Sequence, residues 1–142
     1  MKTTMNRNNT KTRMMALALC LGIAGFAGTA AAANGDDLLA TYKSQGGGTF
    51  TAAAGKSFWT AKHQTEGESR SCTTCHGTDL TKSGKHAKTG KAIDPMAVSV
   101  NSKLLTDPAK VEKWFGRNCR WTLGRECNAQ EKGDVVKYLQ SL

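Results

Sequence analysis

Apolar residues recur at helical spacing in four segments of the chain, and polar or glycine-rich stretches separate these segments. The third segment shows the pattern clearly, because Val111, Trp114 and Phe115 are spaced i, i+3 and i+4 on one face. No stretch alternates apolar and polar residues as a half-buried strand would. The pattern therefore predicts four helices, over residues 36–44, 52–62, from residue 106 or 107 onwards, and 129–140.

Local start and stop signals agree with these segments. Gly46-Gly47-Gly48 ends the first helix, and Pro108 falls in the first turn of the third. Asn128 and Glu131 resemble a capping box, with Asn in place of Ser or Thr. Residues 77–103 hold four Gly or Pro residues, many Lys and Ser, and little periodicity. They predict a long loop, of the kind that often wraps a ligand.

The run CTTCH at positions 72–76 is the most informative motif and is typical of covalent haem attachment. Two thiols at i and i+3, Cys72 and Cys75, lie on one side of a helical turn, where both can reach the vinyl groups of one porphyrin. The adjacent His76 is then placed to ligate the iron, as a proximal histidine does in many haem proteins. The motif predicts one covalent haem c.

Two other readings of this motif are a redox CxxC and half of a zinc site. Zinc requires a second ligand pair of similar spacing, and Cys119 and Cys127, eight positions apart, fit that poorly. A thioredoxin-like motif requires a βαβ context, which the pattern lacks. Both alternatives are therefore weaker than haem attachment.

Residues 1–33 have the composition of a cleavable signal peptide. An apolar run over residues 14–28 follows a basic start without acids, and Ala31-Ala32-Ala33 offers a cleavage site before Asn34. The run is short for a membrane span of about 20 residues, although an uncleaved anchor is the alternative. Cys20 lies inside the run behind Leu19, which argues against a lipoprotein site. We predict export to the periplasm and one cytochrome domain over residues 34–142.

Cleavage of the signal peptide would lower the net charge of the chain. The chain has 20 basic and 11 acidic residues, for a net charge of +9. Four of the basic residues lie in residues 1–33, so the mature chain keeps 16 and its charge falls to +5. The high charge is partly a property of the signal peptide, and we expect no nucleic-acid binding.

Cys119 and Cys127 remain once the motif cysteines are assigned to haem. An even pair in an exported protein points to a disulfide, with two free buried thiols as the alternative. Closing a loop of this length removes about 2–3 kcal/mol of unfolded-state entropy. Disulfides are unusual in ordinary small cytochromes c.

The chain resembles a class I cytochrome c, an all-α fold around one haem. That fold crosses an N-terminal helix with a Gly-x-x-x-aromatic motif against an aromatic C-terminal helix. Gly55 and Trp59 match the first helix, and Val135 and Tyr138 match the second. A missing side chain at the glycine would let the two backbones approach, whereas a simple flaw in the helix is the alternative.

A more specific resemblance covers roughly residues 50–140. Asn118-Cys119 and the run LGREC at 123–127, together with CTTCHG at 72–77 and Thr89-Gly90-Lys91, are similar to the sphaeroides haem protein family. These are high-spin, oxygen-binding c-type cytochromes. The resemblance implies that Asn118 is the sixth iron ligand and that the family's disulfide joins Cys119 to Cys127.

The ligand opposite His76 decides the function, and four residues are candidates. Asn118 would be a hard, weak donor that reduction releases, opening the site to O₂, NO or CO. Met96 would instead give a low-spin His/Met electron carrier. His86 would give a bis-histidine carrier, although His86 and His63 lie in polar, Lys-rich stretches typical of the surface. A peroxidase ranks last because no distal His-Arg pair is evident.

The family resemblance also implies partners, namely a dihaem cytochrome c and a membrane cytochrome b that deliver electrons. Whether turnover of O₂ or NO accompanies gas binding is left open. Arginines flank the two downstream cysteines, and either one of them pairs with a haem propionate or all of them only solvate a face; they are Arg117, Arg120 and Arg125. Lysines at every third position of the loop form either a docking patch for an acidic redox protein or a solvated surface; they are Lys82, Lys85, Lys88 and Lys91.

Overall fold

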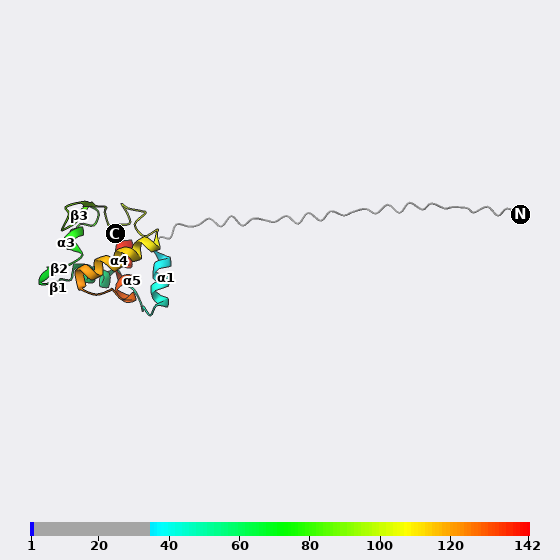
Figure 1. Ribbon diagram of the computed structural model, residues 1–142, viewed down its shortest axis with the longest axis horizontal. Coiled ribbons are helices and arrows are strands. Elements are labelled where there is room, and N and C mark those ends of the chain that lie inside the picture. Colours follow the sequence, from blue (N-terminus) through cyan, green and yellow to red (C-terminus); the bar gives the residue numbers. More distant parts are fainter. Residues whose placement is uncertain (2–34) are drawn as a thin grey trace. The chain divides into compact units, whose positions relative to one another are not determined.

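The computed structural model describes Met1 and residues 35–142 (Figure 1). The helices of this part are α1 Asp36–Ser44, α2 Ala52–Thr60, α3 Thr73–His76, α4 Pro108–Leu123 and α5 Ala129–Gln140. The strands are β1 His63–Thr65, β2 Glu68–Arg70, β3 Gly84–Lys85 and β4 Ala92–Ile93. The prediction of a mostly α-helical fold is confirmed, and α1 and α5 have the predicted bounds.

Side-chain caps begin three of the helices. Thr51 Oγ1 accepts a hydrogen bond from the Ala54 amide at 3.1 Å, and Asp107 Oδ1 accepts one from the Lys110 amide at 3.0 Å. Asn128 and Glu131 form the predicted capping box, with both reciprocal hydrogen bonds present. These caps satisfy amides that a helix start leaves unpaired, which explains why the boundaries could be predicted locally.

Helices α2 and α5 cross at the centre of the fold, as the class I cytochrome resemblance implied. Gly55 is buried against α5, and the Trp59 and Tyr138 rings meet edge to face with centroids 6.3 Å apart. Trp59 and Tyr138 belong to a core cluster with Leu80, Val135 and Leu139. The glycine is therefore a contact point between two helices rather than a flaw in one.

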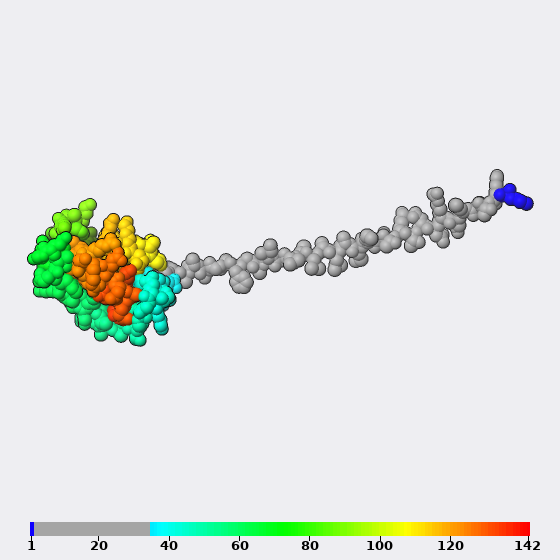
Figure 2. Space-filling model, turned by 60° about the horizontal axis from the view of Figure 1, so that its bottom comes forward, coloured from blue at the N-terminus to red at the C-terminus, as the bar shows by residue number. Residues whose placement is uncertain are grey.

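Helix α1 covers another part of α5. Leu38 and Tyr42 of α1 form a second buried cluster with Leu105 and with Val136 of α5. Figure 2 shows the α1 segment, in cyan, beside the C-terminal segment in orange and red. The two chain ends of this domain thus share one core, as burial of an amphipathic helix face requires.

Two short hairpins accompany the helices. Strand β1 pairs antiparallel with β2, and β3 pairs antiparallel with β4 inside the predicted 77–103 loop. Glu66 and Gly67 connect β1 to β2 with φ of 54° and 78°, the positive values that tight hairpin turns require. Strands of two or three residues are too short to show an alternating pattern in the sequence, so the hairpins were not predicted.

The signal-peptide prediction, its cleavage site and Cys20 fall within residues 2–34, outside the described residues. Within the part of the chain that is described, no helix is long and apolar enough to cross a bilayer. Residues 35–142 are the described part of the predicted cytochrome domain.

Candidate haem site

The CTTCH run forms the short helix α3 and the residues that flank it. The His76 amide donates to the Cys72 carbonyl at 3.1 Å, and Thr74 Oγ1 accepts a hydrogen bond from the Ser71 amide at 3.0 Å. Gly84 of β3 lies against this turn, where a β-carbon would meet the Cys75 carbonyl oxygen at 2.4 Å. The turn is therefore held in shape by its own hydrogen bonds and by close backbone packing.

A cavity of about 860 Å³ opens beside this turn. Cys72, Cys75 and His76 line it together, as the motif predicted. Its apolar wall comes from helices α2, α4 and α5 and from the segment between β4 and α4. The wall includes Phe58, Trp59, Met96, Leu104, Trp114, Phe115, Val135 and Leu139. The volume lies within the range of about 300–1,000 Å³ typical of cofactor pockets.

The residues of the cavity fit a covalent haem. Both thiols are free and half-buried, and burial raises the pKa of Cys72 to about 11, which keeps its thiol protonated. The ring centroids of Trp59 and His76 lie 5.2 Å apart. Burial lowers the pKa of His76, and this favours the neutral imidazole that binds metals. His76 Nδ1 is buried without a hydrogen-bond partner in the described part of the chain.

The zinc alternative finds no support in the described residues. Among them, no group of three or more His, Cys, Asp or Glu side chains is arranged to hold a metal ion. Cys119 and Cys127, which a zinc site would have needed, are joined in a disulfide instead. A porphyrin, which requires one axial ligand from the protein and an apolar pocket, fits this arrangement better than a tetrahedral ion does.

Three of the four candidate distal ligands line the cavity: Asn118, Met96 and His86. Asn118 lies on α4 and is exposed, whereas Met96 is half-buried. His86 is exposed in the second hairpin, and its Nδ1 accepts a hydrogen bond from the Thr89 amide at 3.2 Å. His63 does not line this cavity, and it differs from the predicted surface histidine because it is half-buried beside Phe58, with ring centroids 6.2 Å apart.

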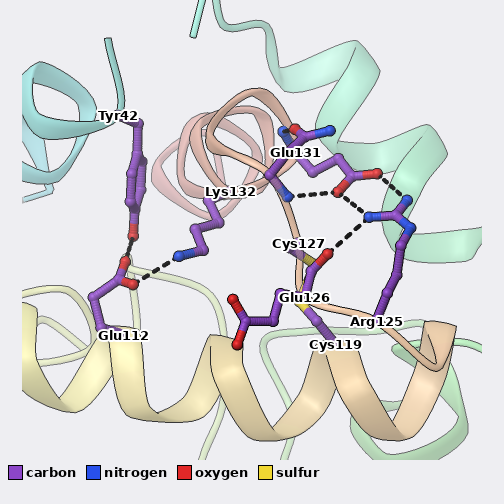
Figure 3. The surroundings of a disulfide bond; sticks show 9 residues. Tyr42, Glu112, Cys119, Arg125, Glu126, Cys127, Glu131 and Lys132 are labelled. Carbon is purple, nitrogen blue, oxygen red and sulfur yellow. Dashed lines mark hydrogen bonds and ion pairs between the residues drawn. A yellow bond between two sulfur atoms is a disulfide. The ribbon is translucent and has the colours of Figure 1, made fainter. Parts of the chain in front are cut away.

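The disulfide between Cys119 and Cys127 joins the end of α4 to the residue before the α5 cap, with the α-carbons 5.6 Å apart (Figure 3). Both cysteines are buried. Arg125 lies in the same connection between α4 and α5. Its two terminal nitrogens donate to the Glu131 carboxylate at 2.8 and 2.6 Å, and Nη1 also donates to the Glu126 carbonyl at 2.9 Å. The residue after Asn118 is thus tied by a covalent bond to the segment that leads into α5.

The β1–β2 hairpin holds the other side of the α4 end, through residues that the sequence analysis did not single out. Arg70 Nη1 donates to the Trp121 carbonyl at 2.9 Å, and Thr65 Oγ1 donates to the Thr122 carbonyl at 2.8 Å. The Arg70 guanidinium also lies 4.8 Å from the centre of the Trp121 ring. The spacing of Glu68 and Arg70 was the sequence signal for their pairing, because alternate residues share one face of a strand.

Basic side chains gather on the lining of the cavity, and they include Lys88, Lys91, Lys103, Lys110 and Arg117. Arg117 also lies over the exposed Trp114 ring, 5.5 Å from its centre. Of the arginines predicted to meet a propionate, Arg120 and Arg125 are paired with Glu126 and Glu131. Arg117 is the one of these three that lines the cavity.

Comparisons with known proteins find a family model and named relatives for this chain. A family model described as "Domain of unknown function (DUF1924)" matches residues 45–139. The cytochrome c-type protein SHP of Cereibacter sphaeroides is 39% identical over 130 residues, which cover 90% of this chain and 97% of that protein.

Solved structures with the same fold include two named relatives. Oxidised SHP, described as an oxygen-binding cytochrome c, matches with a TM-score of 0.70 and 38% identity over 75% of this chain and 96% of its own. The solution structure of cytochrome c'' from Methylophilus methylotrophus, described as giving insight into haem-ligand detachment, matches with a TM-score of 0.68 and 32% identity. That match covers 77% of this chain and 94% of the other. The chain therefore belongs to the sphaeroides haem protein family, a family of c-type cytochromes with covalently bound haem.

Proposed function

We propose that this protein is an exported monohaem cytochrome whose Cys72 and Cys75 form the thioethers and whose His76 is the proximal ligand. When bound there, the haem supplies an iron that exchanges one electron and can take a diatomic gas on its open face. The joint position of the three side chains on one cavity carries this proposal. The residue opposite His76 then decides between gas binding and simple electron transfer.

Asn118 is the proposed distal ligand. It lines the cavity from α4, and no hydrogen bond within the described residues holds its side chain. The amide can therefore turn towards the iron or away from it without breaking a hydrogen bond to the described residues. Its oxygen is a hard donor that suits ferric iron better than ferrous iron. Reduction should release Asn118, whose amide N–H₂ then becomes a hydrogen-bond donor at the vacated face.

The fixed backbone around Asn118 supports this role. Cys119 is bonded to Cys127 just before α5, and the carbonyls of Trp121 and Thr122 accept hydrogen bonds from the first hairpin. A side chain that must leave and return needs a backbone that stays in place, since reordering the segment would cost conformational entropy at each cycle. The rigid end of α4 therefore suits a ligand that moves by side-chain rotation alone.

Met96 is less suited to the distal position. Its amide donates to the Leu80 carbonyl at 2.9 Å, four residues beyond His76. Its side chain packs against the cluster that contains Trp59, the residue beside His76. These contacts favour Met96 as part of the apolar wall, where a flexible thioether fills irregular gaps.

Two relatives give further support. SHP is described as an oxygen-binding cytochrome c, and the solution structure of cytochrome c'' is described in terms of haem-ligand detachment. Oxygen binding and ligand release are the two parts of the function proposed for this chain. We extend both to it because Asn118, the disulfide and the CTTCH turn meet at one cavity.

The visible spectra of the ferric and ferrous holoprotein, with and without CO, test the proposal. We expect high-spin ferrous haem that takes up CO at once. Asn118→Ala should change the ferric spectrum to that of a water-ligated or five-coordinate iron, whereas the control Met96→Leu should leave it unchanged. A methionine-to-iron charge-transfer band that Met96→Leu abolishes, with indifference to CO, would support the carrier function instead.

Periplasmic location and electron delivery complete the proposal. Cytochromes c are exported proteins, and electrons would come from a dihaem cytochrome c and a membrane cytochrome b. Lys88 and Lys91 are exposed at the cavity, where they can attract an acidic donor. The rate of reduction by such a donor should fall as salt is raised. At low salt, the double variant Lys88→Glu, Lys91→Glu should be reduced more slowly than the wild type.

A further inference from the structure

The C-terminal end of α4 presents backbone carbonyls that the helix itself cannot pair. The helix ends at Leu123, so the carbonyls of Trp121 and Thr122 have no amide one turn further along. Arg70 and Thr65 donate to these two carbonyls from the β1–β2 hairpin. The hairpin thus acts as a cap from outside the helix, and the Arg70 cation is placed at the negative end of the helix dipole.

Arg70 also lies next to the haem-attachment turn. It is two residues before Cys72, and Ser71 between them is buried and bonded to Thr74. At the other end of the contact, Trp121 follows Asn118 by three residues, which is less than one helical turn. One side chain therefore links the turn that holds the haem to the helical turn that carries the distal residue.

We propose that Arg70 is a positioning residue, which fixes the α4 turn bearing Asn118 relative to the CTTCH turn and so sets how well Asn118 reaches the iron. This inference rests on the proposed ligation by Asn118. It assigns Arg70 no contact with the iron or the gas. Its effect passes entirely through the hydrogen bond to α4 and the packing on Trp121.

The chemistry of the contact requires an arginine. The side chain is 5% exposed and uses three nitrogens: Nη1 on the Trp121 carbonyl, Nε on Glu68 at 3.0 Å, and Nη2 on Glu68 and Glu66 at 2.8 and 3.1 Å. The two carboxylates compensate the buried charge. A lysine could keep the charge but has neither the planar fork nor the flat face that stacks on Trp121.

A double-mutant cycle of Arg70→Met and Asn118→Ala tests the proposal through the affinity of the ferric holoprotein for added imidazole. Asn118 competes with imidazole for the iron, so Asn118→Ala should tighten imidazole binding. With Asn118 present, Arg70→Met should also tighten it, by about tenfold, because a misplaced Asn118 competes less well. In the Asn118→Ala background, Arg70→Met should change the affinity by less than about twofold.

Equal tightening in both backgrounds would overturn the proposal, because Arg70 would then act on the pocket and not through Asn118. Failure of ligation by Asn118 is distinguishable, since Asn118→Ala alone would then leave both the ferric spectrum and the imidazole affinity unchanged. The matched control is Arg120→Met, which removes the same charge one residue before Trp121 but only a surface pair with Glu126. It should leave the affinity unchanged.

If Arg70→Met does not fold, two milder variants test whether the hairpin positions Asn118. Thr65→Val removes the second external cap from the Thr122 carbonyl and should tighten imidazole binding in the same direction but by less. Arg70→Lys should give an imidazole affinity and a ferric spectrum between those of the wild type and those of Asn118→Ala. If both variants match the wild type in spectrum and affinity, the hairpin does not position Asn118 and the proposal is wrong.

Discussion

A β-carbon on Gly55 would lie 2.0 Å from the carbonyl oxygen of Asp134, far inside van der Waals contact. Helix α2 therefore touches α5 backbone to backbone at this point. The contact sets the depth at which Trp59 and Tyr138 meet, and through Trp59 it sets the wall beside His76.

Gly55→Ala should consequently destabilise the holoprotein strongly, by about 3 kcal/mol, because the helices must move apart to admit one methyl group. Urea unfolding followed by circular dichroism measures the loss. Gly116→Ala is the matched control, since a β-carbon at Gly116 in α4 meets nothing within 4 Å. It should stabilise the protein by about 0.5–1 kcal/mol through helix propensity. A similar small effect at both glycines would contradict the close crossing.

The Cys119–Cys127 disulfide should contribute about 2–3 kcal/mol to the free energy of unfolding. Replacing both cysteines by alanine, or reducing the wild type, should lower the free energy of unfolding measured in urea by the same amount. The ferric spectrum should change along with it, because Cys119 follows Asn118 directly. Titration of the mature holoprotein should find no free thiol. Two reactive thiols would rule out the bond.

Tyr42 anchors α1 to α4 through a charged pair. Its hydroxyl donates to Glu112 Oε1, and Lys132 Nζ donates to Glu112 Oε2 at 2.7 Å (Figure 3). Burial and the hydrogen bond to Glu112 raise the pKa of Tyr42, so the phenol stays protonated. Tyr42→Phe should cost about 1–2 kcal/mol of unfolding free energy.

The Tyr42→Phe effect should shrink in a Glu112→Gln background, because a neutral amide oxygen then replaces the charged acceptor. A double-mutant cycle by urea unfolding measures this coupling. Purely additive losses would show that the hydroxyl and the carboxylate do not interact in solution.

Glu131 should make stability depend on pH in the acidic range. The hydrogen bond from Arg125 holds the pKa of Glu131 below its ordinary value of 4.5. Since the folded-state pKa is depressed, the stabilisation is complete above the ordinary value and is lost as pH falls through the folded one. Glu131→Gln should therefore cost about 1 kcal/mol at pH 7, where the ion pair is intact, and almost nothing well below the lowered pKa.

Unfolding of wild type and variant across pH measures this difference. Glu126→Gln is the control, because the Arg120–Glu126 pair is exposed and should contribute less than about 0.5 kcal/mol at any pH. A Glu131→Gln loss that stays constant with pH would mean that Arg125 does not hold the carboxylate.

The sequence by itself determined what depends on neighbours a few residues apart. Asn128 and Glu131 fixed the start of α5 because a capping box is complete within four residues. The CTTCH run predicted a covalent haem for the same reason, since i and i+3 thiols face one side of any helical turn. Gly55 and Trp59 indicated the helix crossing because that pattern repeats in class I cytochromes c.

Only the tertiary structure decided which distant residues share the cavity and what holds them there. Asn118, Met96 and His86 were open alternatives in the sequence. The structure distinguished Met96, which packs against the core cluster, from Asn118, which is exposed on α4. The contact of Arg70 with Trp121 joins residues 51 positions apart, and it has no local signature. Such contacts depend on how the hairpin and α4 fold against each other, which local spacing does not encode.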